Sequence, residues 1–226
     1  MFDHRIIGAL GIASALAFGV VTQASASPIL GIELMEAGYA TYSTGPVSGD
    51  SLSVSTPFGT FSRNFELNSI VTDPLSLDLL SYNVSTSTAG TLTIIASASG
   101  LDTPAFPGFI SQFSGNFTGA VTSLTLNTYL SSSNTLFDMT GTLLGSLIGT
   151  GTSFGTSVGS DATASGPFAI TEVMTITTSG QATLSLDGSI ASAPEIDAGS
   201  GLAAIALLLG VLGLVGERRR RPVAMA

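Results

Sequence analysis

The sequence predicts an all-β fold, an antiparallel sandwich or a jelly-roll-like domain, and three observations favour this class. Apolar and polar residues alternate with a period of two in several segments, as in strands with one buried face. Serine and threonine supply about a third of residues 27–192, and threonine suits the solvent face of a sheet. Glycine, proline, asparagine and aspartate separate the alternating runs, and no amphipathic helix is evident between them.

The alternating segments follow one another along the chain. Residues 29–36 are expected to form a strand or a single helical turn. A strand begins near Leu75, and its apolar parity switches at Leu80, which indicates a β-bulge. Further strands are predicted at 91–99, 122–130, 166–178 and 181–190, and the last two are predicted to form a hairpin around Ser179 and Gly180. The glycine-rich stretch 141–166 is expected to be a long loop or weak edge strands.

The first 26 residues have the three parts of a secretory signal peptide. Arg5 precedes an apolar run over residues 6–21, and Ala24 and Ala26 form a small-x-small cleavage pattern. The run is shorter than the roughly 20 residues that span a membrane, which favours a cleaved signal over an uncleaved anchor. We therefore expect cleavage after Ala26, and this cleavage removes His4, the only histidine of the chain.

Residues 193–226 combine a short acidic motif, an apolar segment and a basic tail. As a helix, residues 199–216 would be about 27 Å long at about 1.5 Å per residue, close to the roughly 30 Å hydrocarbon core of a membrane. The segment is therefore predicted to be a transmembrane helix, and the positive-inside rule keeps the tail that follows it in the cytoplasm. The basic tail consists of Arg218, Arg219, Arg220 and Arg221. Together with the signal peptide, this helix places residues 27–192 outside the inner membrane.

The C-terminal segment resembles the PEP-CTERM sorting signal of Gram-negative bacteria, which has a Pro-Glu motif, a transmembrane helix and a basic tail in that order. The motif residues here are Pro194 and Glu195, followed by Ile196 and Asp197, and Ala193 precedes them. The usual form is Val-Pro-Glu-Pro, so this chain has a Pro-Glu-Ile-Asp variant. The resemblance implies that an exosortase-like membrane protease cuts near the motif and passes the protein to the cell surface. The alternative is a plain single-pass anchor.

Composition and charge exclude several classes of function. The chain has no cysteine and only 9% charged residues, and its formal net charge is −9. Residues 27–192 contain eleven acids and one base, Arg63, and therefore carry a net charge of −10. The chain also has no lysine. A nucleic-acid-binding surface, a thiolate metal site and a lysine Schiff base are thus excluded. With His4 removed, the exported part also lacks the usual catalytic base.

Two motifs resemble catalytic sites. Gly-x-Ser-x-Gly occurs twice, around Ser153 and Ser157, but this nucleophile elbow requires a histidine, and tandem matches are expected in so glycine-rich a segment. Glu172 falls on an apolar strand face between Ile170 and Met174, where burial raises the pKa of a carboxyl. Paired carboxylates support glycoside hydrolysis without histidine, so Glu172 is the one candidate for acid–base chemistry. We assign no catalytic residue and no cofactor site.

The composition permits calcium binding, because eleven acids could supply carboxylate oxygens. The acids are dispersed and no D-x-D-x-D-G loop occurs, so no Ca²⁺ ligands can be chosen. Asp50, Asp102 and Asp161 lie beside turn-forming residues, which is ordinary for aspartate.

Together these observations predict an exported cell-surface or extracellular-matrix protein that is structural or adhesive and not an enzyme. Its expected partners are the translocon, signal peptidase, an exosortase-like protease and exopolysaccharide, with the membrane as a transient anchor. One alternative is a periplasmic carbohydrate-active enzyme with paired carboxylates, and another is an uncleaved domain anchored in the inner membrane. The ligand and the oligomeric state do not follow from the sequence.

Overall fold

The computed structural model describes residues 27–61, 67–72, 76–101, 108–164 and 166–192. All of its strand pairs are antiparallel, and no helix occurs in these ranges, so the all-β antiparallel prediction is confirmed. The strands are β1 (Ile29–Glu36), β2 (Tyr42–Ser43), β3 (Val47–Ser48), β4 (Ser51–Val54), β5 (Leu67–Thr72), β6 (Ser76–Thr86), β7 (Ala89–Leu101), β8 (Phe109–Ser131), β9 (Thr142–Ile148), β10 (Ser153–Ser160) and β11 (Phe168–Ser192).

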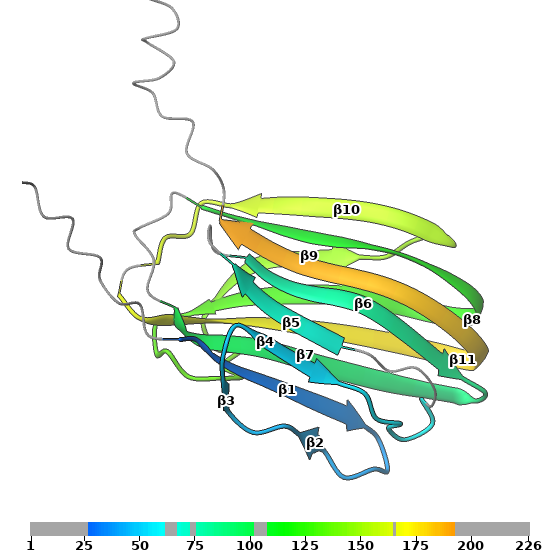
Figure 1. The fold of residues 1–226 in the computed structure, drawn as a ribbon. Helices are drawn as coiled ribbons and strands as arrows, with labels where there is room; N and C mark the ends of the chain where they lie inside the picture. The colour runs from blue at the N-terminus through cyan, green and yellow to red at the C-terminus, as the bar shows by residue number, and fades with distance from the viewer. Residues whose placement is uncertain (1–26, 62–66, 73–75, 102–107, 165, 193–226) are drawn as a thin grey trace, which may run out of the picture.

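The strands form one open sheet whose main path runs β2-β1-β7-β11-β6-β5-β4, with β8 joining β11, β9 and β10 beside this path. The two longest strands, β8 and β11, pair along almost their whole length and bend together near Gly119 and Gly180. Residues 168–179 of β11 pair with β7, whereas residues 182–191 pair with β6. The sheet therefore folds back on itself into two layers, as Figure 1 shows.

We call these halves the first and the second layer. The first layer contains β1, β7, β9 and the halves of β8 and β11 at 121–131 and 168–178. The second layer contains β4, β5, β6, β10 and the halves of β8 and β11 at 109–119 and 182–192. The first strand begins and the last strand ends at the same end of the sheet (Figure 1).

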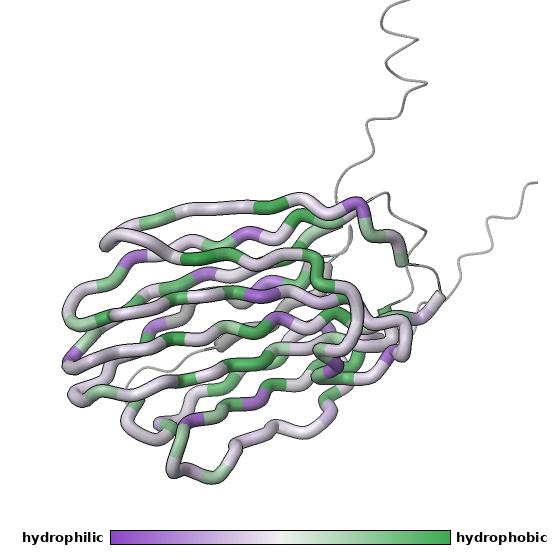
Figure 2. Tube along the Cα trace, turned by 180° about the vertical axis from the view of Figure 1, so that it is seen from behind, coloured by the Kyte–Doolittle hydropathy of each residue, from purple (hydrophilic) through white to green (hydrophobic). Residues whose placement is uncertain are grey.

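The core lies between the two layers. One buried cluster joins Leu126 and Met174 of the first layer to Phe113, Leu184 and Leu186 of the second. A second cluster lies nearer the end where the chain enters and leaves, around Phe109 and Phe168. Apolar residues alternate with polar ones along the strands, as Figure 2 shows, because every second side chain points into this space.

Two features of the predicted architecture need correction. Residues 166–178 and 181–190 do not pair with each other as a hairpin around Ser179 and Gly180, because they are halves of the single strand β11. Each half finds its partners in β8 and in a third strand, so the turn signal marks a bend in a continuous strand. The layers are likewise halves of one sheet and not the two separate sheets of a sandwich or jelly roll.

Other predicted elements are present. Residues 29–36 form a strand, β1, and the glycine-rich stretch contains two edge strands, β9 and β10. The predicted bulge lies in β6, where Leu80 and Ser81 together lie opposite Asp187 of β11. The predicted signal peptide at 1–26 and transmembrane helix at 199–216 lie outside the described residues. Within the described ranges, no helix is long and apolar enough to cross a membrane.

Candidate functional site

The bulge in β6 brings two carboxyl groups together on the outer face of the second layer. Asp78 lies on β6 opposite Ser189 of β11, and Asp187 lies two residues earlier on β11, at the position opposite the bulge. The two carboxyl groups share a hydrogen bond. A bulge turns side chains away from their regular directions, so this local irregularity is what creates the pair.

Each carboxyl of this pair holds its proton more tightly than an isolated aspartate does. Partial burial, the negative charge of Asp187 and the shared hydrogen bond raise the pKa of Asp78 from 3.8 to about 6. Partial burial also raises the pKa of Asp187, whereas the hydrogen bond with Asp78 acts in the opposite direction. Two adjacent carboxyls resist simultaneous ionisation, so the pair holds a proton at a pH where most aspartates have lost theirs.

A third carboxyl, that of Glu172, lies in the core between the layers. Glu172 is fully buried on β11, opposite Ala96 of β7 and Thr128 of β8. Neither of its carboxyl oxygens has a hydrogen-bond partner among the described residues. Burial, followed by the negative charges of Asp78 and Asp187, raises the pKa of Glu172 well above 4.5. The prediction that Glu172 faces the core and that burial raises its pKa is confirmed.

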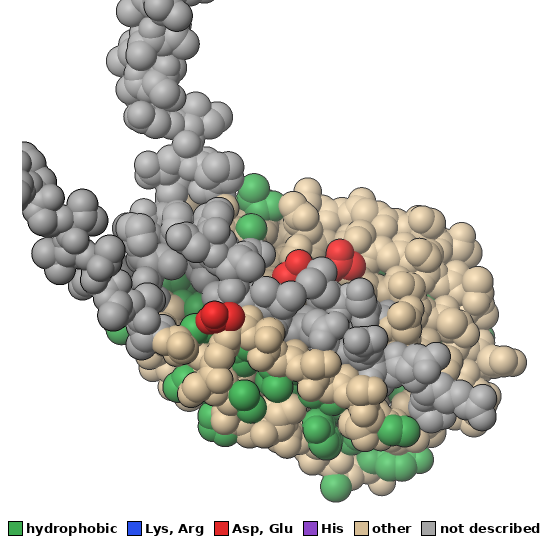
Figure 3. Space-filling view, in the orientation of Figure 1, with side chains coloured by type: hydrophobic (Ala, Val, Ile, Leu, Met, Phe, Trp, Pro, Cys, Tyr) green, Lys and Arg blue, Asp and Glu red, His purple; other side chains and the backbone are tan. Residues whose placement is uncertain are grey.

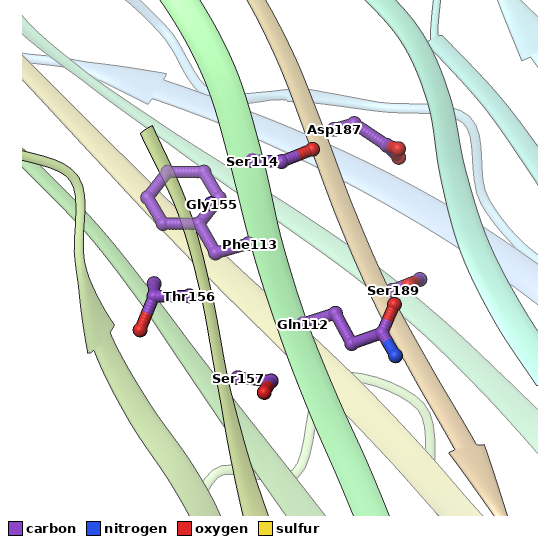
Figure 4. A pocket seen from close by; sticks show the side chains of 8 residues that line it. All are labelled: Gln112, Phe113, Ser114, Gly155, Thr156, Ser157, Asp187 and Ser189. Carbon is purple, nitrogen blue, oxygen red and sulfur yellow. The ribbon is translucent and has the colours of Figure 1, made fainter. Parts of the chain in front are cut away.

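A shallow groove of about 340 Å³ runs beside Asp187 on the outer face of the second layer, between β10, β8 and β11 (Figure 4). Gln112, Ser114 and Ser189 point from this face beside Asp187, and Ser157 lines the groove from β10. Hydroxyl, amide and carboxylate groups of this kind can donate and accept hydrogen bonds to a polar ligand. Among the described residues in this view, a few acidic side chains lie among uncharged ones (Figure 3).

A second hollow, of about 420 Å³, lies beside the loop between β8 and β9. Asp138 organises this loop: its carboxylate accepts hydrogen bonds from the Ser131 hydroxyl, from the Ser133 hydroxyl at 2.7 Å, and from the Thr140 backbone N–H at 2.9 Å and hydroxyl at 2.7 Å. These hydrogen bonds lower the pKa of Asp138 well below its ordinary value. Every acceptor direction of this carboxylate is thus used in holding the loop, which indicates a structural role.

The structure places the other sequence candidates as follows. The two Gly-x-Ser-x-Gly segments lie in and just before β10, and their central residues Ser153 and Ser157 are exposed on this edge strand. No sharp strand-to-helix turn surrounds either serine in the described structure, so no nucleophile elbow is formed. Within the described ranges, no group of three or more His, Asp or Glu side chains is placed to hold a metal ion. The sorting motif at 194–197 lies outside them.

Sequence reasoning found Glu172 but missed the pair formed by Asp78 and Asp187. The missed signal was present, since the parity switch at Leu80 marks the bulge that creates the pair. Its cross-strand partner could not be found, because 108 residues separate the two aspartates and the turn signal at Ser179 suggested the wrong pairing.

Comparison with known proteins concerns the C-terminal segment. The family model of the VPEID-CTERM protein sorting domain matches residues 193–222, and Ala193 stands where the name of the motif has valine. This match confirms the predicted Pro-Glu-Ile-Asp variant of the sorting signal, comprising Pro194, Glu195, Ile196 and Asp197. The C-terminal segment is therefore an exosortase-type sorting signal, which indicates export and processing by an exosortase-like membrane protease. No curated protein matches the chain.

Proposed function

We propose that this chain is a non-enzymatic surface protein, delivered outside the cell through its sorting signal. The observation that carries the proposal is the position of the signal. The last strand ends at Ser192, and the matched sorting domain begins at residue 193. Every described strand therefore lies on the N-terminal side of the motif, so a cut near Pro194 would release the folded domain without removing any strand.

The role proposed for the released domain is structural or adhesive, with the outer face of the second layer as the contact surface. Its groove presents Gln112, Ser114, Asp187 and Ser189, which suit the hydroxyl groups of a matrix exopolysaccharide. Side chains that remain partly hydrated bind such a ligand at low desolvation cost. Before processing, the helix at 199–216 would hold the domain at the inner membrane with its basic tail in the cytoplasm.

A second candidate function, a carbohydrate-active enzyme, has one observation in its favour. Asp78 and Asp187 include a carboxyl with a raised pKa, as a general acid requires. Glycosidases hold their two carboxyl groups about 5–9.5 Å apart to leave room for sugar and water. Asp78 and Asp187 share a hydrogen bond, so they are too close for that reaction. This geometry is the reason for preferring the non-enzymatic proposal.

Intact-mass measurement of the mature protein tests the sorting proposal. We expect the exported form to begin at Ser27 and to have lost residues 218–221 through cleavage near the motif. In cells that lack the exosortase, the same protein should keep its basic tail and stay in the membrane fraction. Retention of Arg218 to Arg221 in exosortase-containing cells would favour the plain membrane anchor.

Co-sedimentation with the producing cells' matrix polysaccharide tests the adhesive role. We expect Gln112→Ala to weaken binding by about threefold to tenfold, from the loss of about one hydrogen bond. Thr183→Ala, an exposed change on the same layer outside the groove, is the matched control. Equal binding by both variants and the parent protein would contradict a role for this groove.

A further inference from the structure

Among the described strands, β10 is the longest at an open edge of the sheet. It has eight residues and, within the described ranges, pairs with β8 alone, whereas β2, β3 and β4 have two to four residues each. β9, the other long edge strand, carries a register shift opposite Thr128 and Tyr129, and such a bulge twists an edge away from further pairing. The pairing of β10 with β8 is regular from Ser153 to Ser160.

The free side of β10 presents a regular set of backbone groups. The Phe117 N–H donates to the Thr152 carbonyl at 2.9 Å, so residue 152 directs its carbonyl toward β8. Along an antiparallel strand, successive residues direct their backbone N–H and C=O groups alternately toward and away from a given neighbour. The register between β10 and β8 continues without a shift. The N–H and C=O groups that point away from β8 therefore belong to Ser153, Gly155, Ser157 and Gly159.

Proteins usually protect such an edge with charge or proline, and β10 has neither. No charged residue occurs between Asp138 and Asp161, although residues 27–192 carry a net charge of −10. Two copies of so acidic a domain repel each other wherever their carboxylates meet. An uncharged edge is the place where a second copy can approach without that cost.

We propose that two copies of this chain pair antiparallel through β10, with Thr156 of one copy opposite Thr156 of the other. The two copies are then related by a two-fold axis perpendicular to the sheet, which places even-numbered residues opposite even-numbered ones. The core-facing sides of the two copies therefore lie on the same side of the combined sheet. This register also pairs Ser153 with Gly159 and Gly155 with Ser157, so all four outward-pointing residues find hydrogen-bond partners. A shift by one residue pair would leave either Ser153 or Gly159 beyond the end of the partner strand, depending on its direction.

Side chains favour the same register. Phe154 of each copy lies opposite Val158 of the other on the core-facing side, and aromatic and β-branched side chains form favourable cross-strand pairs. In one copy Val158 is still 36% exposed, so pairing with the partner strand would bury more of it, while the Phe154 ring stays against Phe113 of its own copy, with ring centroids 4.8 Å apart. On the outer side only serine and glycine meet, which leaves no steric obstacle. The second layers of two copies would thereby become one continuous sheet.

Cysteine cross-linking of the full chain, purified in mild detergent, tests this pairing because the native chain has no cysteine. Thr156→Cys would place two thiols on a non-hydrogen-bonded pair, with Cα atoms about 4.5 Å apart, inside the range that disulfides need. Ser157→Cys is the matched control on the next residue, where the two Cα atoms would be about 8–9 Å apart, too far to bridge. We expect mild oxidation to give at least about tenfold more disulfide-linked dimer with Thr156→Cys.

A second variant distinguishes specific pairing from chance collision. Ser157→Pro removes an N–H that points away from β8, so it leaves the pairing with β8 intact and blocks the edge. In the Thr156→Cys background it should abolish the cross-linked dimer while leaving the thermal unfolding midpoint within a few degrees. Equal cross-linking at residues 156 and 157, persistence of the dimer with Ser157→Pro, or no dimer from Thr156→Cys would each overturn the proposal.

Discussion

The buried carboxyl of Glu172 makes a prediction about stability that can be worked out from the structure. Glu172 is fully buried, and its oxygens have no hydrogen-bond partner among the described residues. A buried polar group without a partner costs about 1–3 kcal/mol of folding free energy. Glu172→Met keeps a long, flexible side chain and removes both oxygens, so we expect it to stabilise the fold by about 1–3 kcal/mol near pH 7.

The gain should depend on pH in a defined direction. The folded-state pKa of Glu172 is raised above 4.5, so below pH 4.5 the carboxyl is protonated in both the folded and the unfolded states. As the pH rises from 4.5 toward the raised folded-state pKa, the unfolded state loses its proton first, and the parent protein loses stability. The stabilisation by Glu172→Met should therefore be smallest near pH 4 and should grow toward neutral pH.

Thermal unfolding of the parent and of Glu172→Met between about pH 4 and pH 8 measures this difference. For a domain of this size, 1 kcal/mol shifts the unfolding midpoint by about 2–4 °C, so the variant should gain about 2–12 °C near pH 7. Glu172→Gln is the control, because it removes the ionisation but keeps a buried polar group; it should flatten the pH dependence with a smaller gain. A variant that unfolds at a lower temperature than the parent near pH 7, or a gain independent of pH, would refute the reasoning.

Three further predictions concern the other carboxylates. Asp78→Asn should remove part of the stability loss that the parent shows as the pH rises from 3.8 through about 6, which urea unfolding at several pH values would detect; an unchanged pH profile would argue against the pairing with Asp187. Asp138→Ala should speed proteolysis in the loop between β8 and β9 while leaving the core intact, and limited proteolysis with mass spectrometry checks this. Gly59→Ala should destabilise the fold by about 1–3 kcal/mol, because Gly59 has φ +59° and an added Cβ would collide with the Glu36 carboxylate; an unchanged unfolding midpoint would contradict this.

Local patterns in the sequence predicted much of the fold, and the reason is the two-residue period of strands. Alternation identified β7, residues 122–130 of β8 and the two halves of β11, because each of these segments has one face in the core. The other half of β8 was missed, because Ser114, Gly115 and Asn116 resemble a turn although they lie within the strand. The parity switch at Leu80 identified the bulge before any pairing was known. Such signals are carried by neighbouring residues, so a single sequence is enough to read them.

Pairing between distant strands was beyond these local signals. A glycine in a turn-like context fits a hairpin and a bend equally well, and the choice at Gly180 depends on whether β8 lies alongside both halves of β11. The contact between Asp78 and Asp187 depends on the register between β6 and β11. Local patterns do not specify this register, so the pair was not predicted. The sorting signal needed no long-range pairing, since its parts lie in order along the chain, and residue order alone identified it.

The acidic groups and the open edge together account for how this domain could stay soluble yet still associate in one way. Net negative charge keeps copies apart in general, and the bulge concentrates two aspartates on the outer face of the second layer. Residues 139–160, which contain both β9 and β10, carry no charged side chain. The bulge in β9 disfavours pairing along that strand. Repulsion between carboxylates on the rest of the surface and the regular backbone geometry of β10 therefore both favour self-association through β10. A charge introduced on β10 should therefore reduce self-association more than the same charge placed on β9.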